Sequence, residues 1–272
     1  MGIYDVLGEM TQKQVMKTEN GDNRIFGAVI GTVTNNYAQE MPGRVCVEIP
    51  TRDSQHNELK WARVAMPSSG STWGHYFLPE VGDQVLVVFE QGNIEKPYII
   101  GCIPKDNNQF LTKSVDEKNT YKKIITKHGS TVLFTDVGDD SASNGEKDKI
   151  AIYTPEKAHN FLMDNENKVI SVFDKEKKNI IEMKTEAGEV LVNCEKKITM
   201  KVGDNITVTM SGSTGTVEIK AKKFKVSEVD GIEMEANKQF KVSAATSVMS
   251  GSSSAKISGG PVTIEGSPIK IG

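Results

Sequence analysis

The sequence has few cysteines, no long apolar run and no excess of charge of either sign. Its three cysteines, Cys46, Cys102 and Cys194, are far apart and odd in number, which argues against a disulfide framework and a clustered metal site. No run of about 18 apolar residues is present, and the N-terminus lacks a charged start followed by an apolar core. We therefore expect a protein made in the cytoplasm without a secretory signal peptide.

The chain also lacks the motifs that catalysis or cofactor binding would require. It contains no G-x-S-x-G, H-E-x-x-H or Walker-type sequence, and 33 Lys and Arg balance 36 Asp and Glu. The adjacent acids Asp139 and Asp140 lie in a polar stretch and are expected to be solvated. We therefore predict no enzyme activity, no catalytic residue, no cofactor and no metal site.

What the chain does contain is a short strand pattern that repeats through its second half. Four units of ten residues begin at positions 150, 160, 170 and 180, and units of eight residues follow from 190. Apolar side chains take alternate positions in each unit, and mostly Lys, Glu and Thr take the others. A unit of about eight residues is too short to hold both a strand and an element that covers it. The repeats therefore predict a rod whose apolar side packs against something outside each unit.

Two architectures satisfy this pattern, namely a β-solenoid wound by one chain and a prism wound by several identical chains. Single-chain solenoids usually carry capping elements and longer irregular loops, and the repeats contain neither. This favours an intertwined trimer, in which one apolar stripe from each chain meets at a shared axis. The predicted trimer core consists of Ile198, Met200, Ile206, Val208, Phe224, Val226, Ile232, Met234, Phe240 and Val242.

The first part of the chain differs, because distinct strands are separated by turn residues. Residues 1–23 are expected to form an N-terminal arm and residues 24–104 a closed, five-stranded OB-type barrel. Residues 105–127 are expected to be a linker, and residues 128–272 a triple-stranded β-helix spike with a C-terminal apex. The predicted fold class is therefore all-β. The five barrel strands are expected at 24–37, 43–50, 60–67, 82–92 and 96–104.

OB-type barrels often bind oligonucleotides, through a basic groove with exposed aromatic side chains. Residues 25–104 of the expected barrel region hold five Lys and Arg against eight Asp and Glu. This local excess of negative charge opposes phosphate binding, so we predict no nucleic-acid partner.

Several motifs of the barrel resemble those of the central spike proteins of contractile injection systems, phage baseplate protein V and VgrG. They are the G-x-V-x-N start at Gly31, the W-A-R-V strand at Trp61, and L-P-E-V-G-D-Q-V-L-V-x-F from Leu78 to Phe89. The units ITMKVGDN and ITVTMSGS are likewise similar to the β-helix of VgrG. The resemblance covers residues 24–272.

The resemblance implies a homotrimer at the centre of a baseplate, with three barrels and a β-helical needle that punctures the target cell envelope when a sheath contracts. The parent particle would be a phage tail, a tailocin or a type VI-like machine, so the protein would end in a virion or in an extracellular or injected particle. No large hub domain precedes the barrel, so a separate hub protein of the baseplate is expected.

The C-terminus resembles the blunt VgrG end that accepts a PAAR-type tip protein. The four histidines, His56, His75, His128 and His159, all lie well before it, so an iron-binding apex is not expected. The predicted contacts with the tip protein are Val262, Ile264, Ile269 and Ile271.

Two other functions stay open at this point. One is a trimeric tail fibre or adhesin rod that binds a receptor, although such fibres usually end in an aromatic-bearing knob and this chain ends in Gly, Ser and Ile. The other, more remote, is a β-helical polysaccharide-degrading enzyme. The even scatter of Lys and Glu along the repeats argues against the cleft that such an enzyme needs.

Overall fold

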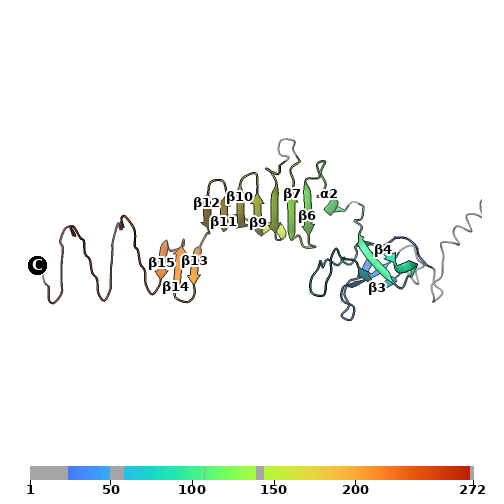
Figure 1. Cartoon of the computed structure of the whole chain (residues 1–272), viewed down its shortest axis with the longest axis horizontal. Helices are drawn as coiled ribbons and strands as arrows, with labels where there is room; N and C mark the ends of the chain where they lie inside the picture. Colours follow the sequence, from blue (N-terminus) through green and yellow to red (C-terminus); the bar gives the residue numbers. More distant parts are fainter. Residues whose placement is uncertain (1–23, 50–57, 107, 139–143, 270–272) are drawn as a thin grey trace, which may run out of the picture. The chain divides into compact units, whose positions relative to one another are not determined.

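A computed structural model of the chain describes residues 24–49, 58–106, 108–138 and 144–269. Its regular structure is almost entirely β-strand, arranged as a closed barrel, a seven-stranded sheet and a three-stranded sheet (Figure 1). The all-β fold class predicted from the sequence is confirmed. The N-terminal arm predicted at residues 1–23 lies outside the described residues.

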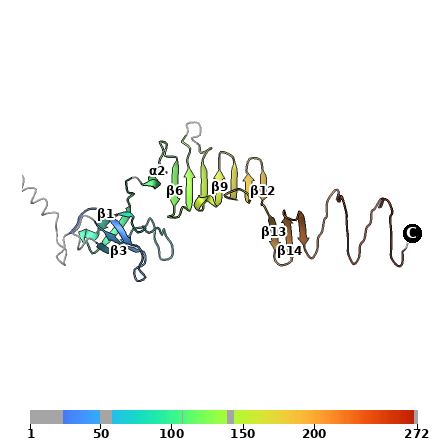
Figure 2. The same cartoon turned by 180° about the vertical axis from the view of Figure 1, so that it is seen from behind.

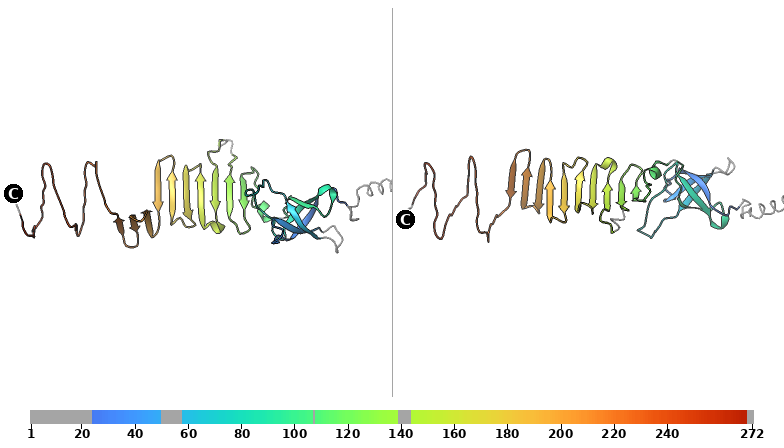
Figure 3. Two further views of the ribbon diagram at one scale, coloured as in Figure 1. Left: turned by 60° about the horizontal axis from the view of Figure 1, so that its bottom comes forward. Right: turned by 90° about the horizontal axis from the view of Figure 1, so that it is seen from above.

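The first five strands close into a barrel in the order β1-β2-β3-β5-β4 (Figure 3). They are β1 (Val29–Asn35), β2 (Arg44–Glu48), β3 (Glu58–Val64), β4 (Gln84–Phe89) and β5 (Pro97–Cys102). The pair β3 and β5 is parallel, and all other neighbours are antiparallel. This is the five-stranded OB-type barrel that the sequence predicted, and every observed strand overlaps its expected range.

The barrel encloses a core of apolar, mostly aliphatic side chains to which all five strands contribute. Its buried members are Val33, Val45, Val47, Ile49, Ala62, Val85, Val87, Phe89, Ile94 and Ile99. Gly31 lies on β1 where the chain passes very close to β2. A Cβ atom there would collide with the side chain of Val47 and lie 3.1 Å from the carbonyl oxygen of Glu48. Close packing therefore requires the glycine of the G-x-V-x-N motif.

The L-P-E-V-G-D motif forms the turn that leads into β4. The backbone N–H of Glu80 donates to Asp83 Oδ2 at 2.9 Å, and Gly82 has a positive φ of 94°. Gly82 donates to the carbonyl of Val33 at 2.8 Å, and Val33 donates to the carbonyl of Asp83 at 3.0 Å. These bonds join the turn to β1. Gly82 and Asp83 thus form the turn that leads into β4.

A seven-stranded antiparallel sheet follows, in which each strand pairs with the next one along the chain (Figures 1 and 2). Its strands are β6 (Tyr121–Ile125), β7 (Thr131–Thr135), β8 (Lys149–Tyr153), β9 (His159–Asp164), β10 (Val169–Asp174), β11 (Ile180–Lys184) and β12 (Glu189–Asn193). From β8 to β11 the strands recur at the ten-residue spacing seen in the sequence.

The stretch expected to be a linker, residues 105–127, is more structured than the sequence suggested. It contains a short helix, α2 (Gln109–Thr112), and the strand β6. Asn108 caps the start of the helix, because its side chain accepts hydrogen bonds from the backbone N–H groups of Phe110 and Leu111. The strand forms because it pairs along its whole length with β7. The sequence did not predict β6, because this strand begins with polar residues.

The chain divides into two compact units, with the boundary between Lys196 and Lys197. The second unit begins with a three-stranded antiparallel sheet of β13 (Lys197–Val202), β14 (Ile206–Ser211) and β15 (Thr216–Lys220). Residues 221–269 form no strand with any described part of the chain. Their backbone swings back and forth in wide, nearly regular bends (Figures 1 and 3).

Candidate assembly surface

One face of the seven-stranded sheet is apolar along almost its entire length. Directly paired residues lie on the same face of a sheet, as do residues two apart in one strand, so the strand registers define two rows across β7 to β12. The first row is Val132, Ile152, Phe161, Val172, Ile181 and Val192. The second row is Phe134, Ile150, Met163, Ile170, Met183 and Val190. We call these twelve residues the apolar face.

The strand β6 extends both rows, with Ile124 beside Val132 and Lys122 beside Phe134. Lys122 is the only charged residue in the two rows, and its Nζ pairs with Asp136 Oδ2 at 2.7 Å. The opposite face of the sheet is mixed. For example, Lys149, Asp164, Lys184 and Glu189 lie on it together with several apolar residues, among them Leu133, Leu162 and Leu191.

No described element covers the apolar face. In the single chain, Val172 is 51% exposed, Ile181 53% and Val192 51%. Monomeric proteins rarely leave a continuous apolar surface of this size open to water. The sheet therefore presents a surface that is suited to contact with another molecule.

The three-stranded sheet repeats this division between two faces. One face carries only apolar side chains, namely Ile198, Met200, Val202, Ile206, Val208, Met210, Val217 and Ile219. The other face carries only polar ones, namely Lys197, Thr199, Lys201, Thr207, Thr209, Ser211, Thr216, Glu218 and Lys220. The four predicted core residues from this region, Ile198, Met200, Ile206 and Val208, thus lie on one face. The strands that carry them pair with one another and with β15 of the same chain.

The other six predicted core residues lie in the extended segment, which we define as residues 221–269. Phe224, Val226, Ile232, Met234, Phe240 and Val242 are all exposed, as are the predicted tip contacts Val262, Ile264 and Ile269. The fourth tip contact, Ile271, lies outside the described residues. The structure thus brings none of these residues together within one chain.

The apolar face of β7 to β12 was missed as a set of residues in the sequence interpretation. We named core positions only in the eight-residue units, although the ten-residue units have the same alternation. Ile150 and Ile152, for instance, show it as clearly as Ile198 and Met200. The signal that could have found the whole face was thus the period of two within each ten-residue unit.

Carboxylates hold the turns between the strands of the seven-stranded sheet. Asp164 accepts hydrogen bonds from the backbone N–H of Asn167 at 3.0 Å and from its Nδ2 at 2.9 Å, and it pairs with Lys149 Nζ at 3.0 Å. Burial raises the pKa of Asp164, but these bonds together outweigh burial and hold its pKa below the ordinary value. Glu166, and then Asp164, raise the pKa of Lys149. The turn between β9 and β10 is therefore held by a network of charged groups around Asp164, which lies on the face opposite to the apolar one.

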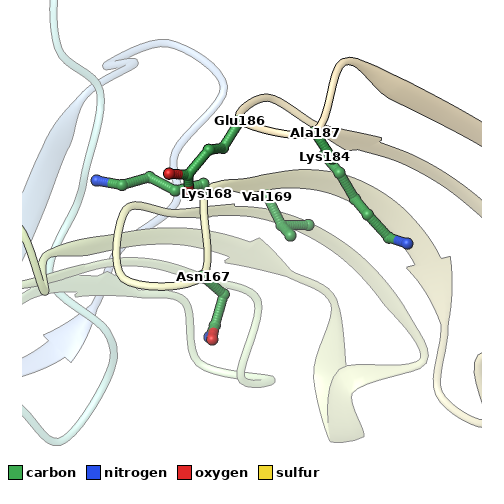
Figure 4. A pocket seen from close by; sticks show the side chains of 6 residues that line it. All are labelled: Asn167, Lys168, Val169, Lys184, Glu186 and Ala187. Atoms are coloured by element: carbon green, nitrogen blue, oxygen red, sulfur yellow. The ribbon is translucent and has the colours of Figure 1, made fainter.

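A shallow hollow of about 460 Å³ lies beside two of these turns and is lined by Asn167, Lys168, Val169, Lys184, Glu186 and Ala187. Figure 4 shows the ammonium groups of Lys168 and Lys184 pointing to opposite sides. The two ammonium groups therefore do not converge on one point of the hollow.

The described residues contain no cluster of His, Cys, Asp and Glu that could hold a metal ion. His75 Nδ1 lies 2.8 Å from Ser68 Oγ in an exposed loop, and no described carboxylate is hydrogen bonded to this histidine. Asp139 and Asp140 lie outside the described residues. Among the described helices, none has the length and apolar character needed to cross a bilayer.

Comparison with known proteins finds a family and several relatives that are similar to the barrel. Residues 29–103 match the family described as the type VI secretion system/phage-baseplate injector OB domain. The "Type VI secretion system spike protein VgrG2a" of Pseudomonas aeruginosa is 35% identical over 93 residues, which cover 32% of this chain and 11% of that protein.

Two further relatives are also type VI secretion system spike proteins. The spike protein VgrG3 of Vibrio cholerae is 36% identical over 85 residues, which cover 29% of this chain and 8% of that protein. The spike protein VgrG5 of Pseudomonas aeruginosa is 26% identical over 148 residues, which cover 46% and 19%. The chain thus spans only about a tenth to a fifth of the length of these curated relatives. Its barrel is similar to the injector OB domain of type VI secretion and phage-baseplate spikes, which confirms the resemblance inferred from the sequence motifs.

Proposed function

We propose that this protein is the structural spike of a contractile injection particle, placed at the centre of the baseplate, and that it punctures the target cell envelope on sheath contraction. The observation that carries the proposal is the apolar face, which the chain builds over strand after strand without covering it. The similarity of the barrel to injector OB domains supports the same proposal.

The active form in this proposal is a homotrimer. The extended segment has alternating apolar side chains but no strand partner among the described residues. If these side chains become buried, the backbone beside them must also find hydrogen-bond partners. Two further copies of the chain would both cover the apolar side chains and provide hydrogen-bond partners for the backbone. Three apolar faces then meet at a common axis, and each fully buried side chain contributes roughly 1.5 to 3 kcal/mol.

This architecture suits a protein that transmits force. Neighbouring strands in a sheet lie about 4.8 Å apart and are joined by hydrogen bonds along the direction in which the sheet grows. A prism with three such walls and a dry centre resists bending and compression, because protein interiors are closely packed. The proposal requires no substrate, no cofactor and no catalytic residue.

The proposed partners follow from this role. A separate hub protein of the baseplate binds near the barrels, and a PAAR-type tip protein binds Val262, Ile264, Ile269 and Ile271 at the C-terminal apex. The protein is made in the cytoplasm, is assembled into a virion or an extracellular or injected particle, and meets the target cell envelope with its needle.

The mass of the purified protein in solution tests the central claim. Light scattering should give three times the chain mass of 29.8 kDa. A monomer at micromolar concentration would contradict the proposal. The variant Ile232→Asp, which places three carboxylates near the axis, should prevent assembly of the extended segment, because isolated buried charges are strongly unfavourable.

A truncation tests the predicted tip contact separately. Ending the chain after Pro261 should leave the trimer intact and abolish binding of a PAAR-type protein in a pull-down with the purified components. Retained binding would show that the contact lies elsewhere, without affecting the proposal of a trimer.

A further inference from the structure

The outer surface of the barrel carries a row of three polar side chains that the proposed spike function does not use. Arg44 on β2 pairs directly with Arg63 on β3, and Arg63 pairs directly with Tyr98 on β5. The next positions on these strands, Val45, Ala62 and Ile99, are in the barrel core. The three polar side chains therefore lie on the outside of the barrel, next to one another.

The two arginines are an unfavourable pair by themselves. Side chains in direct cross-strand pairs have Cβ atoms about 4.5 to 5.5 Å apart, and like charges at such positions destabilise a sheet. Neither the guanidinium group of Arg44 nor that of Arg63 makes a hydrogen bond or a close ion pair with any residue that the structure describes. An anion bound between them would remove this repulsion.

The row borders a hollow of about 230 Å³, which is also lined by Trp61, Glu90, Glu95 and Lys96. Lysine and arginine occur only five times in residues 25–104, against eight Asp and Glu, and three of those five line this one hollow. Three cations of an acidic domain thus lie around a single hollow. Trp61, which is half buried, adds an aromatic surface to the same hollow.

Glu90 on the rim of the hollow attracts Arg63 electrostatically, but its hydrogen bonds go to other side chains. Glu90 accepts a hydrogen bond from the Tyr98 hydroxyl at 2.8 Å through Oε2 and one from Lys96 Nζ at 3.1 Å through Oε1. The bond from Tyr98, followed by that from Lys96, lowers the pKa of Glu90. Glu90 is therefore ionised and already accepts hydrogen bonds from two donors, so neither guanidinium group is hydrogen bonded to it.

We propose that this hollow binds a carboxylate of an acidic protein segment, held between Arg44 and Arg63 and flanked by Trp61. The planar guanidinium group suits a carboxylate because it can donate two parallel hydrogen bonds. Glu90 on the rim disfavours a long polyanion such as nucleic acid, whereas a short acidic peptide can place one carboxylate between the arginines and a backbone amide beside Glu90. The site lies wholly on the barrel and does not depend on assembly into a trimer.

A titration of the full-length chain tests the site. The variant Trp73→Phe leaves Trp61 as the only tryptophan, so its fluorescence reports on the hollow. The probe is an acetylated and amidated tetraglutamate peptide, and the corresponding tetraglutamine peptide is the negative control. We expect saturable binding of tetraglutamate only. Arg44→Ala and Arg63→Ala should each weaken binding at least tenfold. Arg44→Lys should weaken it less, because Lys keeps the positive charge but cannot donate two parallel hydrogen bonds to one carboxylate.

Further titrations test whether a terminal or a side-chain carboxylate binds, and whether binding depends on the charges of this hollow. Tetraglutamine with a free C-terminus reports whether a terminal carboxylate suffices, in place of a side-chain one. The double variant Lys105→Ala and Lys118→Ala removes two charges outside the hollow and should change binding less than twofold. Absence of tetraglutamate binding at 10 mM, on the order of the weakest specific contacts, would overturn the proposal. Tighter binding of inorganic phosphate or octathymidylate with the same arginine dependence would also overturn it.

Discussion

The barrel and the repeat region bury their apolar side chains in opposite ways. In the barrel, a closed sheet surrounds Ile49, Ile99 and five valines so completely that each is less than 2% exposed in a single copy. In the repeat region, the sheets stay open and Val172, Ile181 and their neighbours are half exposed. A closed sheet supplies its own cover, whereas an open sheet with one apolar face needs a partner.

This difference has a consequence for stability. The barrel should have a free energy of unfolding that does not depend on protein concentration, because its core is made by one chain. In the proposed trimer, the stability of the repeat region should rise with protein concentration, as for any folded state that requires association. Both tryptophans, Trp61 and Trp73, lie in the barrel region, so tryptophan fluorescence follows that region alone.

The largest effect is expected from a charge placed on the apolar side of β14. Val208→Asp puts one carboxylate per chain into the proposed dry interior, where each unpaired ion costs several kcal/mol. We expect complete loss of the trimer, measured by light scattering. The neighbouring change Thr209→Asp places the same charge on the polar face and should leave the mass unchanged. Loss of assembly in both variants, or in neither, would show that the two faces do not differ as proposed.

The next effect concerns the barrel alone. Ile99 is fully buried, and Ile99→Ala should lower the free energy of unfolding of the barrel by about 2 to 5 kcal/mol, because it leaves a cavity. Denaturant titration followed by tryptophan fluorescence measures this change. Ile100, the adjacent residue, is 50% exposed, so Ile100→Ala should change stability by about 0.5 kcal/mol or less. A trimer that dissociates in Ile99→Ala would contradict the independence of the two regions.

The same contrast explains which parts of the fold the sequence could predict. The five barrel strands could be located because their turns contain Gly, Pro and Asn, and because the alternation in β4, for example, matches a half-buried strand. The pairing register of the barrel strands could not be predicted, because it depends on close approaches between strands, such as that of Gly31 to Val47. The strand β6 was missed, because Lys122 and Lys123 interrupt its apolar pattern.

In the repeat region, the sequence predicted the period and the apolar side of each unit but not the strand partners. Ile198 and Met200 do lie on one face with Val208, as their spacing required. Whether a strand pairs with its own chain or with another copy depends on turn geometry and association, which the period of two does not encode. The arginine pair on the barrel was missed for a related reason, since Arg44 and Arg63 are brought together only by the register of β2 and β3.

A smaller effect tests the close approach of β1 and β2. Gly31→Ala should lower the free energy of unfolding of the barrel by about 1 to 3 kcal/mol, because the added methyl group forces Val47 and the backbone near Glu48 to move. Gly101→Ala on β5 is the matched control, since no atom lies within 4 Å of its Cβ position. Thermal unfolding followed by tryptophan fluorescence compares the two. Equal stability of both variants would mean that β1 can shift without cost.

The smallest effect is expected from pH acting on the seven-stranded sheet. The folded-state pKa of Asp164 is lowered, so its ionised form stabilises the sheet fully above the unfolded-state pKa of about 3.9. That contribution should disappear as the pH falls from about 4 through the lower folded-state value. Asp164→Asn should cost about 1 kcal/mol at pH 7, because the hydrogen bonds with Asn167 and Lys149 lose their charge.

The measurement for this prediction is thermal unfolding by far-ultraviolet circular dichroism between pH 7 and pH 2. The midpoint of Asp164→Asn should fall less steeply with acid than that of the unmodified chain. Glu186→Gln removes an exposed carboxylate from a neighbouring turn and should leave the acid dependence unchanged. If Glu186→Gln flattened the profile as much as Asp164→Asn, the acid sensitivity would reflect overall charge and not the hydrogen-bonded turn. Neither substitution should change the unfolding of the barrel, which tryptophan fluorescence reports. The described contacts of Asp164 all lie within the seven-stranded sheet.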